Sequence, residues 1–291
     1  MTVTRWFGNR TRAQEVRVHF SPPNRYRWEF LNPDGTVKRL VVSDGEKEKV
    51  YLPHQKKILV GDSAKSYEKL MSEEKETELL FRNYRVSVVG SDKLVGRPVW
   101  ILEFAPLIEG KFYERLWIDQ QSRVILEIKK FRPHGSFAAL SRFTRFEPKP
   151  VADEAFRLDA DSGATVDEHG LDPDFLSIAE LKRATGKDLR APPELPGGFV
   201  FESADFFKVK GHTVHYLRYT DGLAVLSVFE TDRPVQLSQG TAPDTSSDSP
   251  STIRLASTGK IVRRRIGRQN YTLMGELPAS LLEAVFSSFS K

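Results

Sequence analysis

The chain has 291 residues, of which 39% are apolar and 29% charged, so it is long enough and apolar enough for two globular domains. It contains no cysteine, which excludes disulfides and thiolate metal sites, and no run approaching the ~20 apolar residues of a membrane-spanning helix. The 44 basic residues interleave with 39 acidic ones, so the net charge of +5 predicts a mildly basic surface and argues against nucleic-acid binding.

Short amphipathic strands are predicted from the start of the chain. Apolar and polar residues alternate over 15–20 and over 25–30, and the turn Ser21–Asn24 separates the two runs. Asp-Gly dipeptides then mark tight turns, because glycine tolerates the positive φ that such turns need. They separate further strands predicted around residues 40–42, 50–52 and 58–60.

One amphipathic helix is predicted over residues 66–81. Tyr67, Leu70 and Met71 lie at helical spacing, Leu79 and Leu80 return two turns later, and glutamates occupy the remaining positions. Such a helix either covers the open mouth of a curved sheet or packs on a sheet in the ordinary way, and both interpretations need the same residues.

An antiparallel meander of four or five strands is predicted between Asn83 and Pro148. Side chains alternate with a period of two over 99–104 and over 115–119. The loop Pro106–Gly110 and the turn Gln120–Ser122 are short enough to join neighbouring antiparallel strands.

Apolar residues of these strands would share the concave face of a curved sheet. They either fill that face as core or leave a cavity for an acyl chain, and periodicity does not separate the two. The cavity candidates are Trp28, Phe30, Trp100, Phe104, Leu116, Ile118 and Leu126.

The regular pattern breaks between Glu147 and Gly198. Prolines and glycines predict loops there, interrupted by one helix from about Pro173 to Thr185, for which Asp172 is a candidate N-cap. We therefore expect a large domain over 1–165, a linker with one helix over 166–194, and a smaller domain over 195–291.

The second domain is predicted to be another antiparallel sheet. A strand pair spans 261–274 with a turn at Gly267, Pro278 begins an amphipathic terminal helix, and the polar run Gln239–Ser251 is a surface loop. The most basic cluster lies on this strand pair, where alternate arginines face the same way and could clamp carboxylates or phosphates. The pattern itself favours the other interpretation, a solvated edge strand that its charge protects from aggregation. These partner-binding candidates are Arg263, Arg264, Arg265 and Arg268.

Catalytic signatures are missing from the sequence. It has no Gly-x-Ser-x-Gly elbow, phosphate-binding glycine loop or His-Glu-x-x-His pair. His212 and His215 would point to opposite faces of a strand and could not share a metal ion, and Asp119 is interpreted as a turn residue. No cofactor is implied, and we predict a protein that acts by binding.

Ordered short motifs in both parts of the chain resemble the RseB/MucB family. The first set is Asn83–Val86 (NYRV), Val95–Val99 (VGRPV), Arg115–Asp119 (RLWID) and Phe143–Phe146 (FTRF). The second set is Leu195–Phe199 (LPGGF), His215–Tyr219 (HYLRY), Asp221–Glu230 (DGLAVLSVFE) and Gly275–Pro278 (GELP).

This resemblance implies a mainly β fold, with an unclosed, LolA/LolB-like antiparallel barrel and its covering helix, then a smaller sheet with a terminal helix. It implies a periplasmic regulator that binds the extracytoplasmic part of a membrane-spanning anti-sigma factor and controls its proteolysis in envelope stress. The large domain would sense lipid or lipoprotein; the alternative is a LolA-type lipid or lipoprotein carrier. The family is exported, yet Met1–Arg10 lacks the apolar core of a signal peptide, so we expect the natural protein to begin earlier. Oligomerisation stays open.

Overall fold

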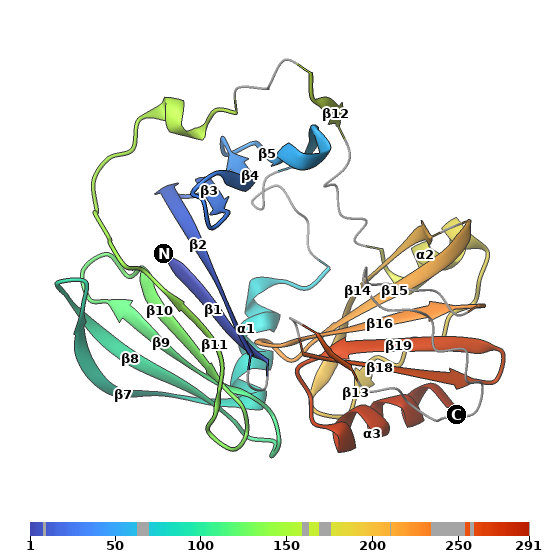
Figure 1. The fold of residues 1–291 in the computed structure, drawn as a ribbon. Coiled ribbons are helices and arrows are strands. Elements are labelled where there is room, and N and C mark those ends of the chain that lie inside the picture. Colours follow the sequence, from blue (N-terminus) through green and yellow to red (C-terminus); the bar gives the residue numbers. More distant parts are fainter. Residues whose placement is uncertain are drawn as a thin grey trace. The chain divides into compact units, whose positions relative to one another are not determined.

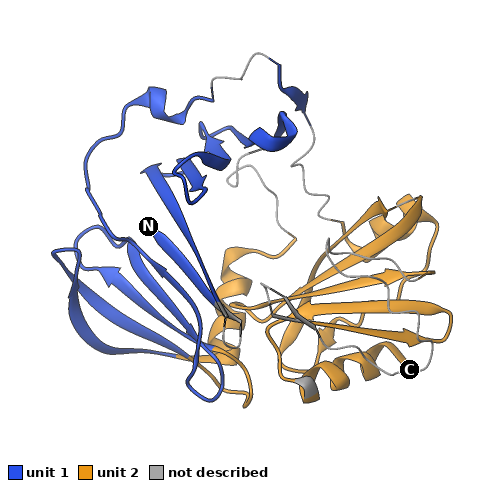
Figure 2. Cartoon of the chain, in the orientation of Figure 1, with its two compact units in different colours: residues 1–68, 86–104, 113–173 blue, residues 69–85, 105–112, 174–291 orange. Residues whose placement is uncertain are grey.

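The chain forms two compact units built mainly of antiparallel strands (Figure 1). The computed structural model describes residues 1–7, 10–62, 70–158, 163–168, 176–209, 211–233, 254–256 and 259–290. Unit 1 comprises residues 1–68, 86–104 and 113–173, and unit 2 comprises 69–85, 105–112 and 174–291 (Figure 2). Two short segments from the first half of the chain, 69–85 and 105–112, therefore belong to the same unit as residues 174–291. None of the helices in the described ranges has the length and apolarity needed to cross a bilayer.

Unit 1 is organised around an open sheet of twelve strands in the order β12-β6-β5-β4-β3-β2-β1-β11-β10-β9-β8-β7. The expected mainly β fold with an unclosed sheet is thus confirmed. β12 pairs with β6 in parallel, whereas the strands from β6 to β8 in this order pair antiparallel. The strands are β1 (Thr2–Phe7), β2 (Arg10–Ser21), β3 (Arg25–Leu31), β4 (Val37–Ser43), β5 (Lys47–Leu52), β6 (Lys57–Asp62), β7 (Tyr84–Leu94), β8 (Arg97–Pro106), β9 (Tyr113–Asp119), β10 (Ile125–Phe131), β11 (Phe137–Arg142) and β12 (Thr165–Asp167).

Tight turns fix the strand pairing of unit 1. The two-residue connection from β7 to β8 has φ of 44° at Val95 and 82° at Gly96, the paired positive values of a hairpin turn that matches the twist of its strands. One short 3-10 helix, η1 (Pro53–Gln55), joins β5 to β6, and another, η2 (Asp153–Phe156), follows the meander. Arg25 lies over the Phe156 ring, and Arg27 donates to the carbonyl of Arg157, so the η2 segment packs along β3.

Unit 2 contains a seven-stranded sheet in the order β13-β14-β15-β16-β19-β18-β17. Its core holds seventeen buried apolar side chains, among them Leu217, Leu226 and Leu273, all at 0% exposure. The predicted strand pair with its turn at Gly267 is confirmed as β18 and β19. The strands are β13 (Glu194–Leu195), β14 (Phe199–Val209), β15 (His212–Thr220), β16 (Val225–Thr231), β17 (Arg254–Ala256), β18 (Gly259–Ile266) and β19 (Gln269–Gly275).

The three α-helices that the structure describes belong to unit 2. The predicted terminal helix is α3 (Ala279–Ser290), whose buried face carries Leu282, Val285, Phe286 and Phe289. The helix predicted in the linker is α2 (Ile178–Thr185); Ser177 caps it in a capping box with Glu180, and Leu181 joins the core. The helix begins later than expected, so Asp172 is not its N-cap. Asp172 and the predicted loop Gln239–Ser251 lie outside the described residues.

The helix predicted over 66–81 is α1 (Glu73–Asn83), which begins at its N-cap Ser72. Periodicity left open whether it covers a curved sheet or packs on a sheet. In the structure α1 belongs to unit 2, where its last turn meets the hairpin between β15 and β16.

Candidate functional site

Six of the seven cavity candidates lie on one face of the unit 1 sheet, called here the shared apolar face. Trp100 lies opposite Ile118 on β9, and Leu116 is on the same side two residues earlier. The cross-strand pairs of β10, β11, β1 and β2 continue this face across the sheet. Val16 and Val18 of β2 then lie opposite Phe30 and Trp28 of β3. The six residues of this face are Trp28, Phe30, Trp100, Phe104, Leu116 and Ile118.

Leu126 lies on the opposite face of the sheet. The pairing of β10 with β9 shifts between Ile125 and Glu127, and this irregularity turns Leu126 toward the cluster formed by Val99 and Trp117. A strict period-two count along the strand misses such a shift. The structure therefore separates Leu126 from the other candidates.

The shared apolar face is only partly covered. Phe104 is 9% exposed and the other five candidates are half-buried, and Phe20 nearby on β2 is 48% exposed. On β4 and β6 of the same sheet, the opposite face is tightly buried, with exposures of 5% or less at Leu40, Val42, Ile58 and Val60. Apolar surface thus remains available on the face for which a packed core and an acyl-chain cavity were the two alternatives.

Two arginines lie over aromatic rings of this face. The Arg39 guanidinium is 3.9 Å from the centre of the Phe30 ring, and that of Arg123 is 4.3 Å from the Trp100 ring. Burial lowers the pKa of Arg39, although the guanidinium remains charged at any physiological pH. The face therefore combines apolar surface with positive charge.

The arginine candidates of β18 divide between the two faces of the second sheet. Arg264 lies opposite Tyr271, pairs with Glu283 of α3 and covers the Phe286 ring at 4.8 Å. Arg263 and Arg265 point to the other face, and Arg268 is exposed in the following turn. Because Arg264 stabilises the packing of α3, Arg265 and Arg268 are the more accessible of the four.

A buried ion pair, which sequence reasoning did not find, ties an early loop to the second sheet within unit 2. Lys111 Nζ is 2.5 Å from Asp221 Oδ2, with side-chain exposures of 2% and 0%. The Tyr84 hydroxyl donates to the same Asp221 oxygen at 2.8 Å, and Lys111 also donates to the carbonyl of Gly197. Burial lowers the pKa of Lys111, against the opposing effect of Asp221. Lys111 and Asp221 are 110 positions apart, and no local sequence pattern predicts that they pair.

The end of α1 is fitted to the same hairpin turn. The Asn83 side-chain amide donates to the carbonyls of Gly198 and Asp221 at 3.1 and 3.0 Å. Gly222 has φ of 94°, and a Cβ there would come within 2.4 Å of the Leu80 backbone nitrogen. Glycine is therefore required at this turn both by its conformation and by the close approach of α1.

A polar cluster lies beneath the helix-covered face of the second sheet. Glu230 lies opposite His215, and Lys187 Nζ is 2.8 Å from Glu230 Oε1. His215 is 5% exposed, and burial lowers its pKa. His212, three residues earlier on β15, lies on the other side of the strand, so the two histidines cannot share an ion.

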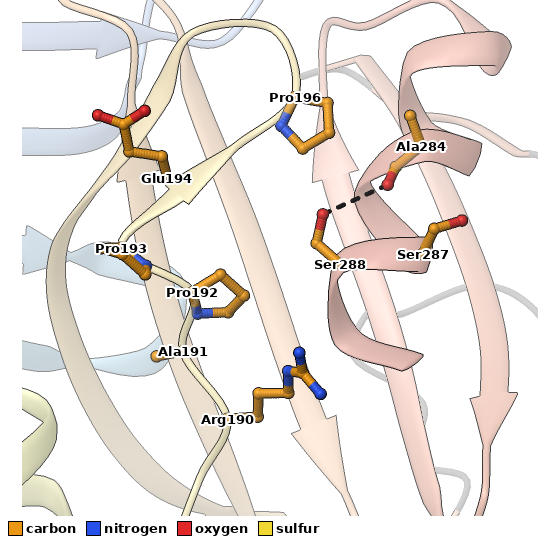
Figure 3. Close-up of a pocket in the computed structure, with 9 residues that line it drawn as sticks. All are labelled: Arg190, Ala191, Pro192, Pro193, Glu194, Pro196, Ala284, Ser287 and Ser288. Atoms are coloured by element: carbon orange, nitrogen blue, oxygen red, sulfur yellow. Dashed lines mark hydrogen bonds between the residues drawn. The ribbon is translucent and has the colours of Figure 1, made fainter. Parts of the chain in front are cut away.

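A shallow pocket of about 610 Å³ lies between the segment before β14 and helix α3 (Figure 3). The Arg190 side chain extends into it, and the small side chains of α3 leave room on the opposite wall. The segment was predicted as linker, and its sequence gives no sign of a pocket. The lining residues are Arg190, Ala191, Pro192, Pro193, Glu194, Pro196, Ala284, Ser287 and Ser288.

Comparison with solved structures matches the fold of almost the whole chain. A crystal structure titled as MucB in complex with MucA(peri) has a TM-score of 0.59 and 18% identity, covering 99% of this chain and 90% of that one. A structure of the Pseudomonas aeruginosa MucA/MucB complex has a TM-score of 0.60 and 17% identity, with coverage of 98% and 89%. MucB by itself has a TM-score of 0.55 and 19% identity, with coverage of 99% and 90%.

Comparison with family models supports the same relationship from the sequence. Residues 23–160 match the MucB/RseB N-terminal domain. A search of curated protein sequences gave no significant match. Residues 23–160 are therefore a MucB/RseB N-terminal domain, and the chain as a whole resembles MucB in fold.

Proposed function

We propose that this chain is a non-enzymatic, extracytoplasmic regulator that binds the periplasmic part of a membrane-spanning anti-sigma factor and thereby controls its proteolysis. The observation that carries the proposal is the likeness of fold over both units to MucB, which was solved in complex with MucA(peri). Members of the family act by binding, in the periplasm. A simple carrier would need only the first domain, so the presence of unit 2 favours the regulator.

A binding assay with the extracytoplasmic part of a membrane-spanning anti-sigma factor from the same organism would test the proposal. The purified chain is expected to bind that fragment and to slow its cleavage by a periplasmic protease. If neither binding nor protection is detected, the regulator function is wrong.

The exposed arginines are the part of the second sheet that we propose to contact an acidic segment of this partner. The double variant Arg265→Glu and Arg268→Glu should weaken binding about tenfold or more, because charge reversal turns attraction into repulsion. The matched control is Arg183→Glu with Arg233→Glu, which changes the net charge of unit 2 equally at two other exposed arginines. Equal affinities for the two double variants would remove Arg265 and Arg268 from the interface.

Lipid sensing on the shared apolar face is a second proposed function, and the half-buried aromatic residues of that face favour it. A lipid whose acyl chain lies against this face would contact Trp28 and Trp100, but not Trp117, which lies on the opposite face. Positive charge at Arg39 and Arg123 would suit an anionic headgroup.

Single-tryptophan variants can test this with brominated lipid, since all four tryptophans, at positions 6, 28, 100 and 117, belong to unit 1. Variants that retain only Trp28 or only Trp100 should be quenched by brominated acyl chains, whereas a variant that retains only Trp117 should not. Equal quenching of all three, or none, would contradict binding on this face. Lipid recovered from the purified chain without an anti-sigma partner would favour the carrier.

A further inference from the structure

Two arginines of unit 1 lie directly opposite each other on neighbouring antiparallel strands. Arg5 of β1 is the cross-strand partner of Arg12 of β2, and Figure 1 shows the two strands side by side. Met1 and Val16 exchange both backbone hydrogen bonds. The arginine pair, four residues further along each strand, is therefore of the same kind, with Cα atoms about 5.5 Å apart. Like charges in this arrangement repel each other and destabilise the strand pair.

The register of the sheet places both arginines on the side that carries the shared apolar face. β2 pairs without a shift with β1 and with β3, so Arg12 lies on the same side as Val16, which is opposite Phe30. The row of directly opposed residues that contains the two arginines also begins at a member of that face. This row is Phe104, Glu114, Lys130, Ala139, Arg5 and Arg12.

No carboxylate among the described residues neutralises the arginine pair. Both side chains are exposed, and neither has an ion pair or a hydrogen bond within the part of the chain that the structure describes. Glu114, in the same row, lies three strands from Arg5, about 14 Å at ordinary strand spacing, and it pairs with Lys130 at 2.8 Å. Glu15 lies on the opposite side of β2. The repulsion between Arg5 and Arg12 is thus left unbalanced.

The same strand shows the usual arrangement five residues later. Arg17 of β2 lies opposite Glu29 of β3, and their charged atoms are 3.5 Å apart. There a cation faces a carboxylate, on the opposite side of the sheet. The like-charged pair lies on the side where apolar surface is accessible, which is where a ligand can reach it.

A phosphate group fits the arginine pair in charge and in shape. Each guanidinium presents a planar fork of N–H donors, and two neighbouring forks can bind different oxygens of one phosphate. A phosphate monoester carries a charge of about −1.5 to −2 at pH 7, which matches two cations, whereas a carboxylate would neutralise only one. Val3, half-buried, is the next residue of β1 on the same side. The group attached to the phosphate can therefore be apolar.

We propose that Arg5 and Arg12 form an anion site that binds a phosphate monoester. The bound phosphate removes the repulsion between the two guanidinium groups, so filling the site stabilises the pairing of β1 with β2. The phosphate belongs either to the headgroup of a lipid or to a free metabolite. A lipid would make this site a headgroup position for the lipid function proposed above, whereas the site does not depend on the regulator function.

Thermal unfolding in chloride and in phosphate buffers of equal ionic strength tests the site. Arg12→Glu turns the repulsion into attraction, so it should raise the midpoint in chloride by about 2 °C. Phosphate at tenfold excess over its dissociation constant should raise the midpoint of the wild type by about 4 °C and leave that of Arg12→Glu unchanged.

The matched control is Arg17→Glu, which changes the net charge equally on the same strand. It places like charges opposite each other at Glu29, so it should lower the midpoint in chloride and keep the response of the wild type to phosphate. An equal response of the two variants to phosphate, or a wild type that does not respond, would overturn the proposal.

Calorimetric titration with small probes distinguishes the two sources of phosphate. If dihexanoyl phosphatidic acid binds about tenfold more tightly than glycerol 3-phosphate, the site takes a lipid headgroup; equal affinities would assign it to a free phosphate monoester. In both cases Arg12→Glu should weaken binding about tenfold and Arg17→Glu less than about threefold. Equal binding of dihexanoyl phosphatidylcholine, which lacks the dianion, would overturn the anion site. Quenching by brominated acyl chains that Arg12→Glu leaves unchanged would also overturn it, while lipid binding on the shared apolar face would stand.

Discussion

The two sheets of this protein differ in how completely their apolar faces are buried. The helix-covered face of the second sheet contains Leu217, Leu226 and Leu273 at 0% exposure, sealed by α2 and α3. On the shared apolar face of the first sheet, Trp28, Trp100 and most of their neighbours are only half-buried. Complete burial contributes most to stability, whereas half-buried apolar surface is available to a ligand.

The difference indicates a division of labour between the units. Unit 2 is closed by a dense core and by a buried ion pair that recruits residues from the first half of the chain. Unit 1 keeps apolar surface accessible. We therefore expect substitutions in unit 2 to act mainly on stability and substitutions on the shared apolar face to act mainly on binding.

The largest loss of stability is expected when the buried ion pair loses one partner. Lys111→Met should lower the free energy of unfolding of unit 2 by about 4 kcal/mol, because it leaves the Asp221 carboxylate buried without its cation. Urea unfolding followed by far-UV circular dichroism, with hydrogen exchange of unit 2 peptides, would measure the loss. Adding Asp221→Asn should recover part of it. A loss below about 1 kcal/mol would contradict the role given to this pair.

Matched leucine truncations test the comparison of the two sheets directly. Leu273→Ala empties a fully buried position and should cost about 3 kcal/mol. Leu116→Ala removes a half-buried side chain from the shared apolar face and should cost about 1 kcal/mol. Urea unfolding of both variants gives the two values; similar losses would show that the first sheet is packed as tightly as the second.

A pair of glycine substitutions separates backbone strain from close packing. Gly35 and Gly222 both have positive φ, of 83° and 94°, but only Gly222 lies against another element, α1. Gly35→Ala should cost about 1 kcal/mol through strain, and Gly222→Ala about 2 kcal/mol more, because its Cβ would displace α1. Equal thermal shifts for the two variants would mean that α1 is not held against this turn.

Local features of the sequence predicted most of the fold because they depend on neighbours in the chain. Alternation predicted the strands, Asp-Gly and Pro-containing segments predicted the turns, and Pro278 marked the start of the terminal helix. The same signals could not predict where α1 packs, since an amphipathic face shows only that a helix is buried on one side. The bonds of Asn83 to Gly198 and Asp221 are what place α1 in unit 2.

The candidate site was predictable where side-chain alternation is regular and unpredictable where it is not. Six cavity candidates share one face because β3, β8 and β9 keep their period, whereas the register shift in β10 moves Leu126 to the other side. Alternation also implied that neighbouring arginines of β18 lie on opposite faces of the sheet. It did not imply that Arg264 pairs with Glu283 of α3. The buried pair of Lys111 and Asp221 depends on tertiary packing alone.

The smallest expected effect is a pH dependence from the buried polar cluster of unit 2. His215 is surrounded by Lys187, Glu230 and Asp232, and burial, aided by Lys187, lowers its pKa in the folded protein. The unfolded chain therefore binds the proton more readily, so this residue destabilises the fold as pH falls below its unfolded value of about 6.5. Replacing it by phenylalanine, which needs no hydrogen-bond partner, should leave stability at pH 7.5 nearly unchanged and reduce the loss on going to pH 5. Urea midpoints of both proteins across this range would measure the difference. If the urea midpoints of the two proteins changed in parallel with pH, His215 would have the same pKa in the folded and unfolded chains. The core of the second sheet would then accommodate a charged imidazole more readily than the burial of His215 indicates.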